Sequence, residues 1–281
     1  MRPRQWTKNA FVFAALVFDE KLTQVPLLIE TLAAFLFFCL ISSTVYIVND
    51  LADRERDQVH PTKRLRPLAS GQLAPRFAIS AAIGMAVIAL GGSFAIRPEL
   101  GWVVLAYLLL NLAYSFYLKN IVIVDVMSIA AGFVLRVVAG VVVVQVARFS
   151  PWLYVCTTLL ALFVGLGKRR HELILLADNA NSHRAILDHY TVPFLDQLIS
   201  LVTSTTVVAY SLYTFSAPNL PPNHSMMLTI PFVLYGLFRY LYLIHVRKLG
   251  GAPDELLLQD MPLLLSVVLW ATSVVAILYF D

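Results

Sequence analysis

The chain has 281 residues, of which 59% are hydrophobic and only 14% are charged, with a net charge of +4. Soluble domains carry about 25% charged residues, so this composition excludes a soluble globular protein. We predict an all-α polytopic membrane protein that forms a single domain over residues 1–281, since no polar stretch is long enough for a second fold.

Apolar segments recur along the whole chain, and most approach the length of about 20 residues that crosses a bilayer. They fall at 9–20, 26–48, 77–97, 100–118, 121–146, 151–167, 193–215, 226–246 and 261–280. The first is short, and it is either a tilted span or an interfacial helix. We therefore predict about nine transmembrane helices, or eight if the first segment does not cross.

Positive charge is distributed unevenly between the two sides of these predicted spans. With nine spans, most of the 21 Lys and Arg residues fall on the side of the N-terminus. The positive-inside rule places that side in the cytoplasm, together with the long loops. We predict a cell-membrane protein with a cytoplasmic N-terminus. We expect no nucleic-acid partner, and a homo-oligomer is compatible with the sequence, which sets no number.

The N-terminal segment RPRQWTKN is basic and contains Trp6. Such a segment fits a membrane-surface anchor. In the alternative interpretation, Lys8 reaches a phosphate group of a ligand.

The segment NDLADRERD, residues 49–57, follows the second apolar segment. If it is helical, Asn49, Asp53 and Asp57 recur every fourth residue and share one face with Asp50 nearby. Oxygen ligands suit hard cations such as Mg²⁺, and clustered carboxylates repel one another without a cation. We therefore predict a metal site formed by Asn49, Asp50, Asp53 and Asp57, the three aspartates being catalytic.

Basic residues follow this acidic segment directly, in the sequence HPTKRLRP. Lys63, Arg64 and Arg66 suit a phosphorylated ligand held by the same metal. Together the two segments predict a metal–diphosphate site at a membrane surface.

The short loop between the fourth and fifth predicted spans carries Tyr114 and Lys119. They either contact phosphate oxygens or serve as interfacial anchors. Within the fifth span lie Asp125 and Arg136, and ionisable residues inside spans usually face the bundle interior. Arg136 is either part of a buried structural pair or part of a substrate cavity.

The loop after the sixth span opens with GKRRHE, residues 167–172. One interpretation is a positive-inside anchor with a Lys168–Glu172 surface pair. The other is a wall of substrate-binding residues that holds phosphate opposite the carboxylates, formed by Lys168, Arg169, Arg170, Glu172, Arg184 and Tyr190.

At these residues the chain resembles the UbiA superfamily of intramembrane prenyltransferases. Residues 49–57 match its first aspartate-rich motif, N-D-x-x-D-x-x-x-D, and residues 66–71 match the R-P-x-x-S-G tail that follows it. The resemblance implies a UbiA-type bundle with an active site on the cytoplasmic loops. Tyr114 and Lys119 depart from the Y-x-x-x-K pattern of that superfamily, because they are one residue further apart.

The chain departs from the superfamily members that use aromatic acceptors, because the loop after the sixth span has no second D-x-x-x-D motif. With RPRQWTKN, HPTKRLRP and GKRRHE, it looks like the branch that makes decaprenylphosphoryl-phosphoribose. That resemblance implies phosphoribosyl pyrophosphate and a polyprenyl phosphate, such as decaprenyl phosphate, as substrates. It also implies Mg²⁺ dependence and a role in supplying arabinose donors for cell-wall arabinan.

Two other functions remain open from the sequence. One is the transfer of a polyprenyl group from its diphosphate to an aromatic acceptor, which would share the first motif but expects the second. The other is a transporter or lipid-binding protein, which would use the intramembrane charges Arg136 and Arg239 and has no need of a ladder of carboxylates.

Overall fold

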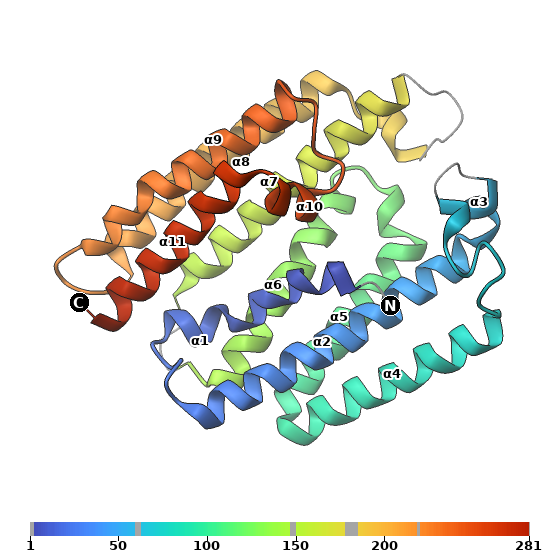
Figure 1. Cartoon of the computed structure of the whole chain (residues 1–281), viewed down its shortest axis with the longest axis horizontal. Helices are drawn as coiled ribbons and strands as arrows, with labels where there is room; N and C mark the ends of the chain where they lie inside the picture. The colour runs from blue at the N-terminus through green and yellow to red at the C-terminus, as the bar shows by residue number, and fades with distance from the viewer. Residues whose placement is uncertain (1–2, 60–62, 147–149, 178–184, 218–219, 281) are drawn as a thin grey trace. The chain divides into compact units, whose positions relative to one another are not determined.

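A computed structural model describes residues 3–59, 63–146, 150–177, 185–217 and 220–280. All regular structure within these ranges is helical, mostly α-helix with short 3₁₀ helices between (Figure 1). The all-α prediction is confirmed.

Eight helices in the described ranges are long and apolar enough to cross a membrane. They are α2 (Val25–Ala52), α4 (Pro75–Ile96), α5 (Pro98–Phe116), α6 (Val124–Val144), α7 (Pro151–Ala177), α8 (Val192–Ser216), α9 (Ile230–His245) preceded by the 3₁₀ helix η5 (Ser225–Thr229), and α11 (Met261–Phe280).

The first predicted segment is helical but differs from the other eight. It forms the 3₁₀ helix η1 (Pro3–Phe13) and the short helix α1 (Ala14–Phe18), and neither is long enough to be among the eight. The shorter elements of the loops are α3 (Arg54–Val59), η2 (Lys63–Leu65), η3 (Leu118–Asn120), η4 (Ala185–His189) and α10 (Pro253–Gln259).

Proline sets the start of several of these helices. A proline occupies one of the first two positions of α2, α4, α5, α8, α9 and α10. Its fixed φ suits the first turn, where its missing N–H has no intrahelical partner to lose. At α8, the hydroxyl of Thr191 also accepts a hydrogen bond from the N–H of Phe194.

Two helices extend beyond the apolar segments that predicted them. Helix α2 continues past residue 48 to Ala52, and α7 continues past residue 167 to Ala177. The acidic motif (residues 49–57) and the basic motif (residues 167–172) therefore begin on the ends of long helices, which gives their side chains directions set by the helical repeat.

The chain forms two compact units. The first contains residues 1–16, 22–118 and 135–145, and the second contains residues 17–21, 119–134 and 146–281. In the first unit, α2 packs along α4 and against η1, and α4 packs on α5 (Figure 1). Its core is built around buried side chains such as Phe38, Ile41 and Val104.

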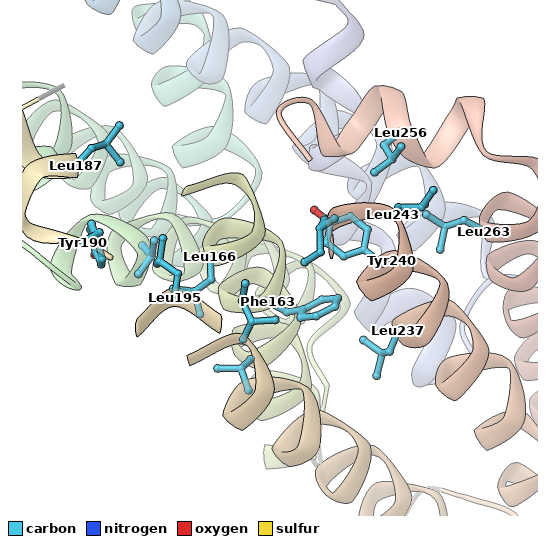
Figure 2. Close-up of a cluster of buried hydrophobic side chains, with 14 of the residues drawn as sticks. Phe163, Leu166, Leu187, Tyr190, Leu195, Leu237, Tyr240, Leu243, Leu256 and Leu263 are labelled. Carbon is cyan, nitrogen blue, oxygen red and sulfur yellow. The ribbon is translucent and has the colours of Figure 1, made fainter. Parts of the chain in front are cut away.

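The second unit contains the pairs α7–α8 and α9–α11, which pack side by side. Its largest buried cluster includes Phe163 and Leu166 of α7, Leu195 of α8 and Tyr240 of α9 (Figure 2). Leu187 and Tyr190, from the segment between α7 and α8, belong to the same cluster (Figure 2).

In the first unit, η1 lies close to α6 at Gly140. A Cβ added there would overlap the backbone carbonyl of Val12, which cannot rotate away as a side chain would. We expect Gly140→Ala to destabilise the protein by about 1–3 kcal/mol through overpacking. A lower melting temperature of the purified protein in detergent would show this.

The matched control is Gly84→Ala on α4, where an added Cβ has nothing within 4 Å. Alanine favours a helix interior over glycine, so this change should be neutral or slightly stabilising. Equal melting temperatures for the two variants would contradict the close approach of η1.

Candidate active site

The acidic motif of the first unit lies where α2 passes into α3. Asn49 and Asp50 are in the last turn of α2, Asp53 ends it, and Asp57 is in α3. The N–H of Asp53 donates to the carbonyl of Asn49 at 2.9 Å, and the N–H of Asp57 donates to the carbonyl of Asp53 at 2.8 Å. The backbone thus keeps the predicted four-residue repeat through the break between the helices.

Arg66 connects two carboxylates of this motif. Its Nη1 lies 2.6 Å from Oδ2 of Asp57 and 3.1 Å from Oδ1 of Asp50. Asp57 is buried, with 3% of its surface exposed, and a buried carboxylate is costly unless a cation compensates its charge. Arg66 supplies that cation in this structure.

The R-P-x-x-S-G segment holds Arg66 in place. The N–H of Ser70 donates to the carbonyl of Arg66 at 2.8 Å and closes one turn. The N–H of Leu73 donates to the carbonyl of Pro67 at 2.9 Å and closes a wider turn, in which Gly71 has a φ of 80°. Leu68 is buried against α2 and α4, and its carbonyl accepts a hydrogen bond from Nε of Arg54. The turn therefore returns Arg66 toward α3.

Gly71 is required by this turn for its backbone conformation and not for space. Its φ of 80° is unfavourable for residues with a Cβ, whereas an added Cβ would have no atom within 4 Å. We expect Gly71→Ala to cost about 1–2 kcal/mol in unfolding free energy. Gly71→Asn should cost less, since asparagine tolerates this conformation better. The measurement is thermal unfolding, and equal losses for both variants would contradict the conformational explanation.

The other substrate-binding residues predicted before α6 lie in four different helices. Arg64 is exposed in η2, and Lys63 lies in the same 3₁₀ helix. Lys8 lies in η1, where its Nζ donates to Oε1 of Gln5 at 2.7 Å. Tyr114 is partly buried in the last turn of α5, and Lys119 is partly buried in η3.

In the second unit, Arg169 lies within a buried network. Its Nε donates to Oδ2 of Asp125 at 2.6 Å, and its Nη1 pairs with Oε2 of Glu172. Only 2% of the Arg169 side chain is exposed, and none of Asp125. Glu172 therefore pairs with Arg169, a partner that the sequence had not suggested. The two carboxylates on Arg169 favour a structural role over phosphate binding.

Tyr190 belongs to the same network. Its hydroxyl donates to Oδ1 of Asp125 at 2.8 Å and accepts from the N–H of Ile123 at 2.7 Å. Burial raises the pKa of Tyr190 to about 12, so the hydroxyl remains a donor at neutral pH. The sequence had marked Asp125 as a buried ionisable residue without identifying these partners.

Arg170 has partners of its own on the same helix. Its Nε lies 2.6 Å from Oδ1 of Asp196 in α8, and its Nη1 donates to the carbonyl of Ile244 at 3.1 Å. Lys168 is partly buried one position before Arg169. Arg184, which the sequence also suggested for phosphate binding, lies outside the described residues.

A second buried network in the first unit contains Arg136, which is 5% exposed within α6. Its Nε donates to Oδ1 of Asn9 at 2.8 Å, and its Nη2 donates to the hydroxyl of Tyr107 at 2.8 Å. Asn9 is fully buried and also contacts Cys39 and Ser42 of α2. These contacts fasten η1 to three spanning helices, which favours the structural interpretation of Arg136.

The acidic motif has donors that suit a hard divalent cation. Asp50 and Asp57 already share one cationic group, and Asn49 and Asp53 add an amide and a carboxylate oxygen on the same helical stretch. No three His, Cys, Asp or Glu side chains converge as a metal site among the residues that the structure describes. The donor chemistry fits Mg²⁺, with Arg66 now between two of the donors.

Comparison with known proteins connects these features to a family. The model of the UbiA prenyltransferase family matches residues 10–252. The chain therefore belongs to this family, and it is a membrane-embedded transferase with many spans. The matched range covers parts of both compact units.

Full-length relatives share about a third of its residues. The chain is 32% identical to decaprenyl-phosphate phosphoribosyltransferase from Mycobacterium tuberculosis, over 100% of this chain and 93% of that protein. It is 30% identical to the protein of the same name from Corynebacterium glutamicum, over 99% and 85% respectively.

A solved structure supports the fold. A UbiA homologue from Archaeoglobus fulgidus, bound to GPP and Mg²⁺, superimposes with a TM-score of 0.73. The alignment covers 99% of this chain and 97% of that one, at 16% sequence identity. The predicted UbiA-type fold is thereby confirmed.

Proposed function

We propose that this protein transfers 5-phosphoribose from phosphoribosyl pyrophosphate to a polyprenyl phosphate, such as decaprenyl phosphate, with Mg²⁺ as cofactor and release of pyrophosphate. The observation that carries the proposal is its full-length similarity to proteins named decaprenyl-phosphate phosphoribosyltransferase. The product would supply arabinose donors for cell-wall arabinan. In this proposal the reaction occurs on the cytoplasmic side of the cell membrane, and the whole chain forms one catalytic domain.

The charges of the chain suit this pair of substrates. The donor carries a diphosphate and a 5-phosphate, and the lipid carries one phosphate. The helical extension of α7 presents Lys168 at the place where a second acidic motif would be expected in an enzyme with an aromatic acceptor. Cationic groups stabilise additional phosphates better than a second set of carboxylates would.

The proposed roles follow from this charge arrangement. Asn49, Asp50, Asp53 and Asp57 hold the metal, which when bound would neutralise charge on the pyrophosphate as it leaves. Arg64 and Lys63 add positive charge near this group, and Lys168 is assigned to a phosphate of the sugar or the lipid. Arg169 and Tyr190 keep α7 in position through Asp125.

The transfer itself is a substitution at the anomeric carbon. An oxygen of the lipid phosphate forms the new bond to this carbon, with inversion. The bond to pyrophosphate breaks, and the leaving group takes the electron pair. A phosphate monoester is already anionic near pH 7, so the attacking oxygen needs no side-chain base.

The test is to incubate the purified protein with radiolabelled phosphoribosyl pyrophosphate, decaprenyl phosphate and Mg²⁺. Label should move into the organic phase, and a chelator should abolish this transfer. Absence of transfer, together with prenylation of an aromatic acid from a polyprenyl diphosphate, would instead identify the enzyme as an aromatic prenyltransferase.

A further inference from the structure

Arg66 stands out because it belongs to the same site as the predicted metal ligands and contacts two of them. One nitrogen, Nη1, lies between Oδ1 of Asp50 and Oδ2 of Asp57. The two aspartates come from different helices, α2 and α3. The contact therefore fixes the position of α3 relative to the end of α2, in addition to balancing charge.

A metal ion and this guanidinium would compete for the same oxygens. Mg²⁺ binds carboxylate oxygens at about 2.1 Å, so an ion shared by these two oxygens would need the space that Nη1 fills. Two positive charges at that separation would also repel each other. Binding of one metal ion to these two oxygens together requires Arg66 to leave.

Arg66 has the freedom to leave. About a quarter of its side chain is exposed, whereas only 5% of the Asp57 side chain is exposed. Its backbone is held by the turn that Ser70 closes, so a displaced guanidinium would remain near the site. A diphosphate bound to the metal would offer it a new partner, since guanidinium groups bind phosphate oxygens in pairs of hydrogen bonds.

We infer that Arg66 is the internal counter-ion of the acidic motif: it keeps Asp50 and Asp57 together in the metal-free protein, and gives way to the metal that accompanies the diphosphate. This inference rests on the proposed function, since it assumes that the motif binds a metal–diphosphate. It makes Arg66 a positioning residue whose loss strengthens the binding of metal alone and weakens the binding of diphosphate.

The test is to titrate the full-length protein with Mn²⁺ alone, following free Mn²⁺ by electron paramagnetic resonance. In Arg66→Gln the competing charge is gone, so we expect Mn²⁺ to bind about tenfold more tightly than in the unaltered protein. Arg66→Lys keeps the charge and should remain closer to the unaltered protein. In the presence of inorganic pyrophosphate, Arg66→Gln should no longer bind Mn²⁺ more tightly than the unaltered protein.

The matched control is Arg64→Gln. It removes the same charge from an exposed neighbour in η2, two residues away, so it measures the general electrostatic effect alone. The counter-ion role requires that Arg66→Gln increase Mn²⁺ affinity clearly more than Arg64→Gln does. Weaker or unchanged Mn²⁺ binding in Arg66→Gln, an equal effect of Arg64→Gln, or no Mn²⁺ binding by any of these proteins would overturn it.

Failure of the counter-ion role can be distinguished from failure of the proposed function. The Mn²⁺ titrations, with and without inorganic pyrophosphate, use neither phosphoribosyl pyrophosphate nor a lipid. Tighter Mn²⁺ binding in Arg66→Gln without phosphoribosyl transfer would leave the counter-ion role intact and reject only the substrate. If the unaltered protein transfers phosphoribose but Arg66→Gln weakens Mn²⁺ binding, the proposed function stands and the counter-ion role is rejected.

Discussion

Replacing Asp53 with alanine should lower the rate of phosphoribosyl transfer by at least about a hundredfold, with little loss of folding stability. Loss of a single group that stabilises a developing charge commonly costs this much in rate. Asp53 is the middle member of the repeat and is only partly buried at the junction of α2 and α3. Its removal therefore takes away a proposed metal ligand without emptying a core position.

The measurement is the initial rate of label transfer at increasing Mg²⁺ concentrations. A lost ligand should raise the Mg²⁺ concentration needed for half-maximal rate as well as lowering the maximum. The matched control is Glu55→Ala, which removes an exposed carboxylate from α3 two residues away and off the repeat. Turnover near that of the unaltered protein for Asp53→Ala at saturating Mg²⁺ would refute the metal role.

The acidic motif was predictable because it depends on local geometry. A spacing of four residues places side chains on one helix face, and the structure keeps the helical hydrogen bonds through Asp53. The pairing of this motif with Arg66 was harder to predict from the sequence. Arg66 reaches Asp50 from 16 residues away, through a turn whose course depends on Gly71 and on the burial of Leu68. Composition indicated a cation near a phosphate site, but not that it would bridge two carboxylates.

The basic motif shows where sequence reasoning fell short. One of the two interpretations of the three consecutive cations was a single phosphate-binding wall, which assumes that their side chains point together. Because α7 continues to Ala177, successive residues are rotated by about 100° from one another. Arg169 consequently turns to Asp125 of α6, and Arg170 turns to Asp196 of α8. These partners lie 44 and 26 residues away, beyond the reach of a local pattern.

The different burial of these two ion pairs leads to the largest stability effect that we expect. Asp125→Ala should lower the free energy of unfolding by about 3–5 kcal/mol, since it leaves the buried guanidinium of Arg169 without its fully buried carboxylate partner. It also removes the acceptor of the Tyr190 hydroxyl. Thermal unfolding in detergent or lipid nanodiscs measures this loss, and Asp125→Asn should recover part of it by accepting one hydrogen bond.

Asp196→Ala is the natural control, because it removes the same kind of partner from the adjacent arginine. The Asp196 side chain is 36% exposed, against 0% for Asp125, so solvent screens the Arg170 pair. We expect this variant to lose at most about 1 kcal/mol. If Arg169 instead served mainly to bind phosphate, Asp125→Ala would unfold at the same temperature as Asp196→Ala and would raise the KM for phosphoribosyl pyrophosphate. A large loss of stability confined to Asp125→Ala would mean that Arg169, the central arginine of the basic motif, holds α6 to α7. It would then favour Lys168 over Arg169 for the proposed phosphate contact of this segment.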